Sequence, residues 1–242
     1  MLHGFAGSPY NFHPLLASMK QKQMGYYAPL FTGFGLQDFH ILRTIKASDW
    51  LRDAIYAYDL LAQVADKVSI VGHSNGGVLA CLLAQIRPVH KMILVEPYFV
   101  GCDDDKKSKD LVFTPVRLEM VKTVCPIAEK SHCPGRSTYS DFVDPKAGAE
   151  NFAQASVSVS SLSVLWKLQD QVDCKKIKAD SIFVLYGAQS LSINIKAGLK
   201  KLDDAGWIYK TIMYSNSAHT PQLDFDKDAV NADIVAILQG QD

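Results

Sequence analysis

Hydrophobic and polar residues follow two alternating rhythms along most of this chain. Short runs rich in branched and aromatic residues are typical of buried strands, whereas apolar residues at every third or fourth position are typical of a helix face. Strands are expected at residues 1–3, 26–30, 68–71, 92–95, 181–186 and 207–214, and helices at 11–20, 49–65, 75–86, 164–169, 194–205 and 226–239. Because strands and helices alternate, the pattern predicts an α/β fold with a mainly parallel sheet of about six strands, covered by helices on both faces.

This alternation stops between residues 101 and 178. The segment opens with a charged stretch and contains a serine-rich stretch at 156–163, and strand periodicity resumes only at residue 181. We therefore expect a core formed by residues 1–100 and 179–242, with residues 101–178 inserted into it.

The composition of the chain argues against nucleic acids and the membrane interior as partners. The chain carries 25 basic and 25 acidic side chains, so no positive surface for DNA or RNA is expected. No apolar run approaches the roughly 20 residues that span a bilayer, and residues 1–20 lack the pattern of a secretory signal. Five cysteines without C-x-x-C pairs are interpreted as reduced thiols. The sequence therefore favours a cytoplasmic protein without an integral membrane segment.

A serine stands at the junction between the expected strand 68–71 and the helix that follows it. Residues 72–76 read Gly-His-Ser-Asn-Gly, the G-x-S-x-G pattern that puts a serine on a sharp strand-to-helix turn. Gly72 and Gly76 allow the tight bend and the close approach of the two elements, because neither carries a Cβ atom. The hydroxyl of Ser74 is then exposed above the N-terminus of a helix, which predicts a nucleophile.

A serine hydroxyl needs a base within hydrogen-bond reach before it becomes a good nucleophile at neutral pH. His219 follows the last expected strand, and ligands bind at the carboxyl ends of parallel strands, so His219 is the candidate base. The alternative is an ordinary surface histidine on a loop. The backbone N–H groups of Phe5 and Asn75 are the candidate oxyanion hole, since Asn75 follows the serine and Phe5 follows the first strand. For Phe5, the alternative is a plain turn at a strand end.

These residues resemble the α/β-hydrolase superfamily and, within it, the bacterial carboxylesterases and monoacylglycerol lipases. The resemblance rests on residues 2–7, 28–35, 49–50, 72–77 and 219–224. It implies a serine hydrolase that cleaves carboxylic esters through an acyl-enzyme, with Ser74 and His219 in a Ser-His-acid triad and with no metal or organic cofactor. It also implies that residues 101–178 form a cap over the active site.

The usual triad acid of this superfamily is missing from its usual place. The loop that would carry it is residues 187–194, hereafter the acid loop, and the matching position holds Ser190 instead of aspartate. Glu96, at the end of the expected strand 92–95, is the best substitute, since some members of the superfamily carry their acid there. We expect Glu96 to orient His219. The alternative is that Glu96 has no catalytic role, because Glu-Pro also occurs at this strand end in hydrolases that keep the usual acid.

The start of the chain also differs from the family pattern. Most members of the superfamily carry two or more strands ahead of the His-Gly segment, whereas Met1 stands two residues before His3. We expect the sheet to lack those strands and to expose an edge, and an exposed edge leaves a homodimer open.

The expected substrate is a small molecule, either a short or medium acyl ester or a monoacylglycerol. Aromatic residues could line an apolar acyl pocket beneath the cap, although each is more readily explained as plain core. The candidates are Phe31, Phe34, Phe99, Phe113 and Trp166. Two further functions stay open: a catalytically decayed relative that only binds a ligand, and an acyltransferase in which an alcohol replaces water.

Overall fold

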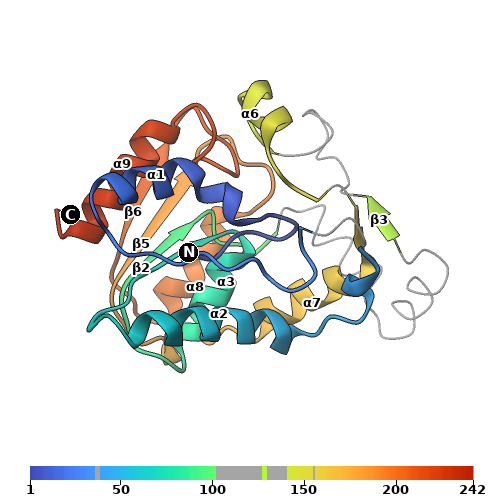
Figure 1. The fold of residues 1–242 in the computed structure, drawn as a ribbon, viewed down its shortest axis with the longest axis horizontal. Helices are drawn as coiled ribbons and strands as arrows, with labels where there is room; N and C mark the ends of the chain where they lie inside the picture. The colour runs from blue at the N-terminus through green and yellow to red at the C-terminus, as the bar shows by residue number, and fades with distance from the viewer. Residues whose placement is uncertain (36–38, 102–126, 130–140, 155, 242) are drawn as a thin grey trace.

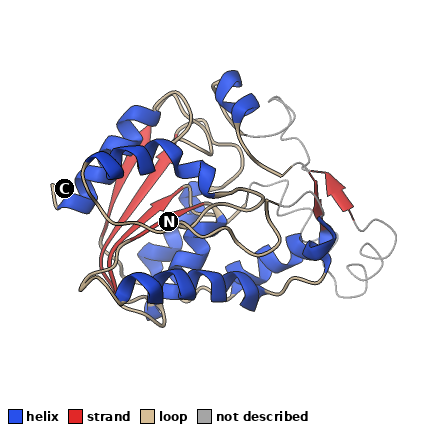
Figure 2. Ribbon diagram, in the orientation of Figure 1, coloured by secondary structure: helices blue, strands red, loops and turns tan. Residues whose placement is uncertain are grey.

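The computed structural model describes residues 1–35, 39–101, 127–129, 141–154 and 156–241 (Figure 1). Among these residues the main sheet has four strands, all parallel, in the order β1-β2-β5-β6 (Figure 2). They are β1 (Ile70–His73), β2 (Val89–Val95), β5 (Ala179–Gly187) and β6 (Tyr209–Tyr214). Leu2 forms a parallel bridge with Gly72 and so adds the N-terminal segment to the β1 edge. The predicted fold class, a mainly parallel sheet with helices, is confirmed.

Helices cover both faces of this sheet (Figure 1). One layer consists of α1 (His13–Gln21) and α9 (Lys227–Gln239), and the other of α2 (Ala47–Ala62), α3 (Asn75–Ala84) and α8 (Ile195–Asp204). Successive residues of β2 point to opposite layers: Ile93 and Val95 share an apolar cluster with α1 and α9, whereas Met92 and Leu94 share one with α2 and α3. Both faces of a central strand are therefore apolar, as expected of a parallel sheet between two helix layers.

Most helices begin and end within a few residues of the predicted positions. Near the start of α2, the carboxylate of Asp49 accepts the Lys46 N–H at 2.8 Å. Asn194 caps α8 by accepting the Ala197 N–H at 3.0 Å. α9 ends at Gly240, whose φ of 79° is the left-handed conformation that glycine adopts without strain. Local capping chemistry thus sets the same boundaries that the hydrophobic periodicity indicates.

The strand expected at 26–30 is wrong. Residues 24–31 have no regular secondary structure: the Tyr27 carbonyl accepts the Met1 amine at 2.7 Å, and the Phe31 N–H donates to the His3 imidazole at 3.0 Å. These backbone groups bond to a terminal amine and to a side chain instead of a neighbouring strand. The described main sheet therefore has four strands plus the bridge at Leu2, fewer than the six expected.

Shorter elements complete the described chain. They are η1 (Pro9–Phe12), η2 (Phe39–Arg43), β3 (Ile127–Glu129), α6 (Pro145–Glu150), β4 (Ser156–Ser158), α7 (Val159–Asp170) and η3 (Cys174–Lys176). β3 and β4 pair as a separate antiparallel sheet, and α7, which includes the helix expected at 164–169, packs against α2 and α3. Cys81 and Cys174 are buried free thiols, whereas Phe113 and the other cysteines lie outside the described residues. None of the described helices has both the length and the apolar character needed to cross a membrane.

Candidate active site

Ser74 lies on the turn between β1 and α3, in a backbone conformation that L-residues rarely adopt. Its φ is 53° and its ψ is −117°. Three main-chain hydrogen bonds hold it there: its N–H donates to Val95 at 2.9 Å, and its carbonyl accepts from Gly77 at 2.9 Å and from Tyr98 at 3.1 Å. Such strain costs on the order of 1–3 kcal/mol and persists only where the surroundings enforce it. The Ser74 side chain is therefore fixed at the start of α3 rather than free to turn away.

Two glycines allow the close packing around this turn. A Cβ atom on Gly76 would lie 1.9 Å from the carbonyl oxygen of Leu2, and one on Gly72 would lie 2.5 Å from the carbonyl oxygen of Gly76. Real Cβ atoms essentially never approach another heavy atom within 3.0 Å. The N-terminal segment, β1 and the first turn of α3 can therefore touch only because both positions are glycine.

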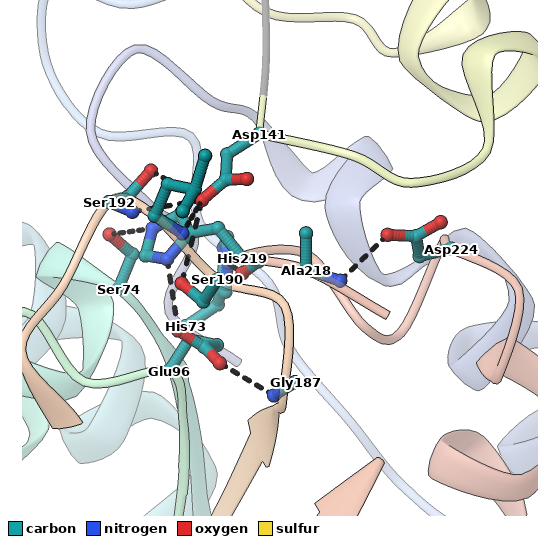
Figure 3. A network of polar contacts seen from close by, with 11 residues as sticks. His73, Ser74, Glu96, Asp141, Gly187, Ser190, Ser192, Ala218, His219 and Asp224 are labelled. Carbon is teal, nitrogen blue, oxygen red and sulfur yellow. Dashed lines mark hydrogen bonds and ion pairs between the residues drawn. The ribbon is translucent and has the colours of Figure 1, made fainter. Parts of the chain in front are cut away.

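The side chains of Ser74, His219 and Glu96 form a hydrogen-bonded chain (Figure 3). The Nε2 atom of His219 lies 2.9 Å from Ser74 Oγ, and its Nδ1 atom lies 3.2 Å from Glu96 Oε2. The three residues follow β1, β2 and β6, so the carboxyl ends of three parallel strands bring them together. One ring nitrogen faces a hydroxyl and the other faces a carboxylate, an arrangement that can accept the serine proton and stabilise the resulting imidazolium.

Glu96 is fully buried, and both of its carboxylate oxygens have partners. Oε1 accepts the Gly187 N–H at 2.6 Å, which leaves Oε2 directed at His219. The Glu96 N–H donates to Leu185 at 2.8 Å, and its φ of 49° is again a conformation that non-glycine residues rarely adopt. A buried carboxylate is tolerated when it is paired and hydrogen-bonded in this way.

Ser190, which the sequence aligns with the usual acid, has a different partner. Its Oγ lies 3.5 Å from Asp141 Oδ2. The hydrogen bonds described for the His219 imidazole go to Ser74 and Glu96, and Ser190 is not among these partners.

Phe5, a predicted oxyanion residue, lies in a turn that packs against Ser74. The Gly7 N–H donates to the Gly4 carbonyl at 3.0 Å, so residues 4–7 form a turn with Phe5 near its centre. The N–H of that position is not used by the turn itself. A Cβ atom on Gly4 would lie only 3.2 Å from Ser74 Cβ, which shows how closely this turn approaches the serine.

Asn75, the second predicted oxyanion residue, is the first residue of α3. Backbone N–H groups in the first turn of a helix have no acceptor within the helix. The N–H groups of Phe5 and Asn75 thus belong to the two segments that flank Ser74, and their role in binding an oxyanion stays a prediction.

His3 supports the turn that carries Phe5. This buried imidazole donates from Nδ1 to the Gly4 carbonyl at 2.8 Å and accepts the Phe31 N–H at Nε2 at 3.0 Å. Such bonding requires a neutral ring with its proton on Nδ1. Burial, which disfavours the charged form, lowers the pKa of His3 from 6.5 to about 4.

We expect the protein to lose stability as the pH falls from 6.5 to 4, and His3 to cause part of this loss. Between these values His3 is protonated in the unfolded chain but stays neutral in the folded protein. The free energy of unfolding therefore decreases as the pH falls, and His3 contributes about 3 kcal/mol to this decrease. Urea unfolding of His3→Gln and of the wild type across this range measures the effect. The difference between them should shrink as the pH falls, and a constant difference would contradict the assignment. His13→Gln, at an exposed histidine, is the matched control.

Three residues that are not among the predicted site residues hold the loop of His219, two through their side chains and one through its main chain. The Nε2–H of His73 donates to the His219 carbonyl at 2.8 Å, and the carboxylate of Asp224 accepts the Ala218 N–H at 2.9 Å. The carbonyl of Asp141 accepts the His219 N–H at 3.1 Å. Asp224 follows His219 closely in the chain, which is a signal that could have indicated it. Asp141 comes from the interrupted segment 101–178 and has no such signal.

The aromatic candidates for an acyl pocket are buried. Phe31, Phe34 and Phe99 belong to the apolar cluster between the sheet and α2, and Phe34 stacks on Trp50 with ring centroids 5.2 Å apart. Trp166 on α7 is also buried. These positions agree with the interpretation of the rings as core.

The described residues offer serine, imidazole and carboxylate chemistry at this site. Within the same ranges, no group of three histidine, cysteine, aspartate or glutamate side chains is placed to hold a metal ion.

A parallel sheet between helix layers, with a serine on a strained strand-to-helix turn, is the arrangement of the α/β-hydrolase class of proteins. The sequence profile of the Alpha/beta hydrolase family matches residues 1–232, and this chain belongs to that family.

Solved structures of similar fold include three proteins of 15–19% sequence identity to this chain. One comes from work on LipS and LipT, two metagenome-derived lipolytic enzymes, with 19% identity, a TM-score of 0.80, and coverage of 98% of this chain and 91% of that one. A monoacylglycerol lipase from Paleococcus ferrophilus has 15% identity, a TM-score of 0.76, and coverage of 100% and 93%. A carboxyl esterase from Bacillus coagulans has 15% identity, a TM-score of 0.76, and coverage of 99% and 88%. At these identities the likeness shows the fold.

Proposed function

We propose that this protein is a serine esterase that cleaves carboxylic esters with short or medium acyl chains, or monoacylglycerols. The observation that carries the proposal is the hydrogen-bonded chain from Ser74 through His219 to Glu96. A strained serine, a base at 2.9 Å and a buried carboxylate behind the base are the parts that nucleophilic catalysis requires. The lipolytic enzymes, the monoacylglycerol lipase and the carboxyl esterase of similar fold support the ester class of substrate.

In the first half of the reaction, Ser74 Oγ attacks the ester carbonyl carbon while His219 Nε2 takes the hydroxyl proton. The negative charge moves to the carbonyl oxygen, where the N–H groups of Phe5 and Asn75 bind it. When this intermediate collapses, the bond to the alcohol breaks and His219 returns its proton to the leaving alcohol. Glu96 keeps the imidazole in the required tautomer and stabilises its charged form throughout.

In the second half, water attacks the acyl group on Ser74, with His219 as the base that removes the water proton. Collapse of the second intermediate releases the carboxylic acid and regenerates the Ser74 hydroxyl. In this proposal, residues 1–100 and 179–242 form the catalytic core, and residues 101–178 form a cap over the active site.

Labelling with a fluorophosphonate tests whether Ser74 is an activated nucleophile. The wild type is expected to gain one adduct per chain, which peptide mapping places at Ser74, because the reagent reacts only with a serine that a base activates. Ser74→Ala should gain none. Ser18→Ala is the matched control and should label like the wild type. It removes a hydroxyl in α1 that donates a hydrogen bond to the Pro14 carbonyl. A folded wild type without an adduct would contradict the proposal and favour a protein that only binds its ligand.

Product analysis separates ester hydrolysis from acyl transfer at the same site. An esterase converts the acyl group to the free acid even when an alcohol is added, since water is the acceptor. An acyltransferase would instead form a new ester with the added alcohol in place of the acid. Turnover of p-nitrophenyl butyrate with and without glycerol, followed by mass spectrometry of both products, makes the distinction.

A further inference from the structure

The acid loop lacks an acid of its own at position 190 but binds one from a distant part of the chain. The Oδ2 atom of Asp141 accepts the N–H groups of Leu191 at 2.6 Å and of Ser192 at 2.9 Å, and the Ser192 hydroxyl at 3.0 Å. It also lies 3.5 Å from the hydroxyl of Ser190, the position that the family resemblance aligns with the usual acid. Figure 3 shows this carboxylate beside Ser192.

The same residue contacts the loop of the candidate base. The main-chain carbonyl of Asp141 accepts the His219 N–H at 3.1 Å. Asp141 therefore joins two loops that follow different strands: its carboxylate binds the acid loop after β5, and its carbonyl binds the loop after β6. Its exposed fraction is only 9%, so these bonds lie largely out of water, where each is harder to replace.

A second buried carboxylate keeps Asp141 in this place. Asp224 accepts the N–H groups of Val143 at 2.9 Å and of Asp144 at 2.8 Å, the residues that follow Asp141 closely in the chain. Asp224 also accepts the Ala218 N–H at 2.9 Å, next to His219. Residues 141–144 are thus attached directly to the loop of the candidate base.

We infer that Asp141 is a positioning residue that supplies, from outside the acid loop, the carboxylate that position 190 lacks. This inference rests on the proposed esterase function. Asp141 fixes the acid loop and the main chain of His219 in one geometry, and so keeps the imidazole between Ser74 and Glu96. Because a displacement of about 1 Å at a reacting group can cost about 100-fold in rate, such support affects turnover more than substrate binding.

Moving the carboxylate from Asp141 to position 190 tests this inference. In the wild type, Ser190 Oγ lies 3.5 Å from Asp141 Oδ2. In Ser190→Asp alone, a second carboxylate would lie close to that of Asp141, and the two like charges would repel each other. In the double variant Asp141→Ala/Ser190→Asp, a single carboxylate remains, now attached to the acid loop. The same substitution at residue 190 should therefore lower activity in one background and raise it in the other.

The experiment measures kcat and KM for p-nitrophenyl butyrate at a temperature where circular dichroism shows every variant folded. Asp141→Ala is expected to lower kcat about 100-fold with little change in KM. Asp141→Asn should lower it less, because the amide oxygen still accepts the Leu191 and Ser192 N–H groups. Ser190→Asp should lower kcat, whereas the double variant should recover at least about tenfold over Asp141→Ala.

A matched control is Glu150→Ala, which removes an exposed carboxylate near the end of α6, outside residues 141–144. This substitution should leave kcat within about twofold of the wild type. Two results with an active wild type would overturn this inference but not the proposed function. One is an Asp141→Ala variant that keeps its kcat, and the other is a double variant no more active than Asp141→Ala. A wild type that neither hydrolyses esters nor labels at Ser74 would overturn the proposed function, and the role of Asp141 in that reaction with it.

Discussion

Replacing Glu96 by glutamine is expected to lower kcat for ester hydrolysis about 10,000-fold while the protein stays folded. In the wild type, the Gly187 N–H donates to Glu96 Oε1 at 2.6 Å. Because this N–H still needs an acceptor, the amide oxygen of the new glutamine would face Gly187 and its NH₂ group would face His219. The imidazole would then have to accept at Nδ1 and carry its proton on Nε2. In that tautomer Nε2 donates to Ser74 and cannot take the serine proton.

Steady-state kinetics with p-nitrophenyl butyrate and the rate of fluorophosphonate labelling measure this effect. Glu150→Gln, at an exposed position near the end of α6, is the matched control and should keep wild-type values. A decrease of less than about tenfold in folded Glu96→Gln would reject Glu96 as the acid, because loss of a triad acid costs far more. In that case Glu96 would be a buried structural residue that binds Gly187.

Replacing Gly76 by alanine is expected to lower the free energy of unfolding by about 3 kcal/mol or more and to abolish labelling at Ser74. The new Cβ atom would meet the Leu2 carbonyl oxygen at 1.9 Å and the His3 carbonyl oxygen at 2.8 Å. These are backbone atoms, so neither can turn away as a side chain would. Either α3 or the N-terminal segment has to move, and both carry a candidate oxyanion N–H group.

Urea unfolding followed by circular dichroism measures this loss of stability. Gly198→Ala is the matched control, since Gly198 also lies in a helix but a Cβ atom there would meet only ordinary contacts with Phe99 at 3.6 Å. Alanine favours a helix over glycine by about 1 kcal/mol, so this control should be as stable as the wild type or more so. If Gly76→Ala were within about 1 kcal/mol of the wild type, the packing described for this turn would be wrong.

Hydrophobic periodicity predicts most of the fold because each strand or helix that packs in the core has apolar residues at the positions that face its neighbours. β2 carries apolar residues on both faces and α2 carries them on one, and each pattern is local to its own segment. The strand expected at 26–30 rests on two tyrosines and a leucine, although Pro29 lacks the N–H group that a strand ladder uses. It fails because its hydrogen-bond partners, the His3 imidazole and a terminal amine, are distant in the chain and leave no local pattern.

In the candidate site, too, residues with a local sequence signal could be predicted, whereas contacts between distant parts of the chain could not. Ser74 stands in a motif, and His219 and Glu96 follow strands, so their convergence at one sheet edge could be expected from topology. The absence of an acid at position 190 could be read from the sequence, but the hydrogen bonds of Asp141 to the acid loop could not. Asp141 lies 50 residues from Leu191 in the chain, in a segment without periodicity, and only the folded structure brings the two together.

The pairing of the first helix with the last has a consequence for synthesis of the protein. Phe12 and Leu15 of the N-terminal region share an apolar cluster with Val230 and Ile234 of α9. The part of this sheet face that α9 covers therefore stays exposed until residues 227–239 have been translated, and His219 is made only shortly before them. A nascent chain with an exposed apolar sheet is prone to aggregation during that interval. The proposed hydrolytic activity can therefore appear only after His219 and α9 have left the ribosome, so a shorter nascent chain cannot attack cellular esters.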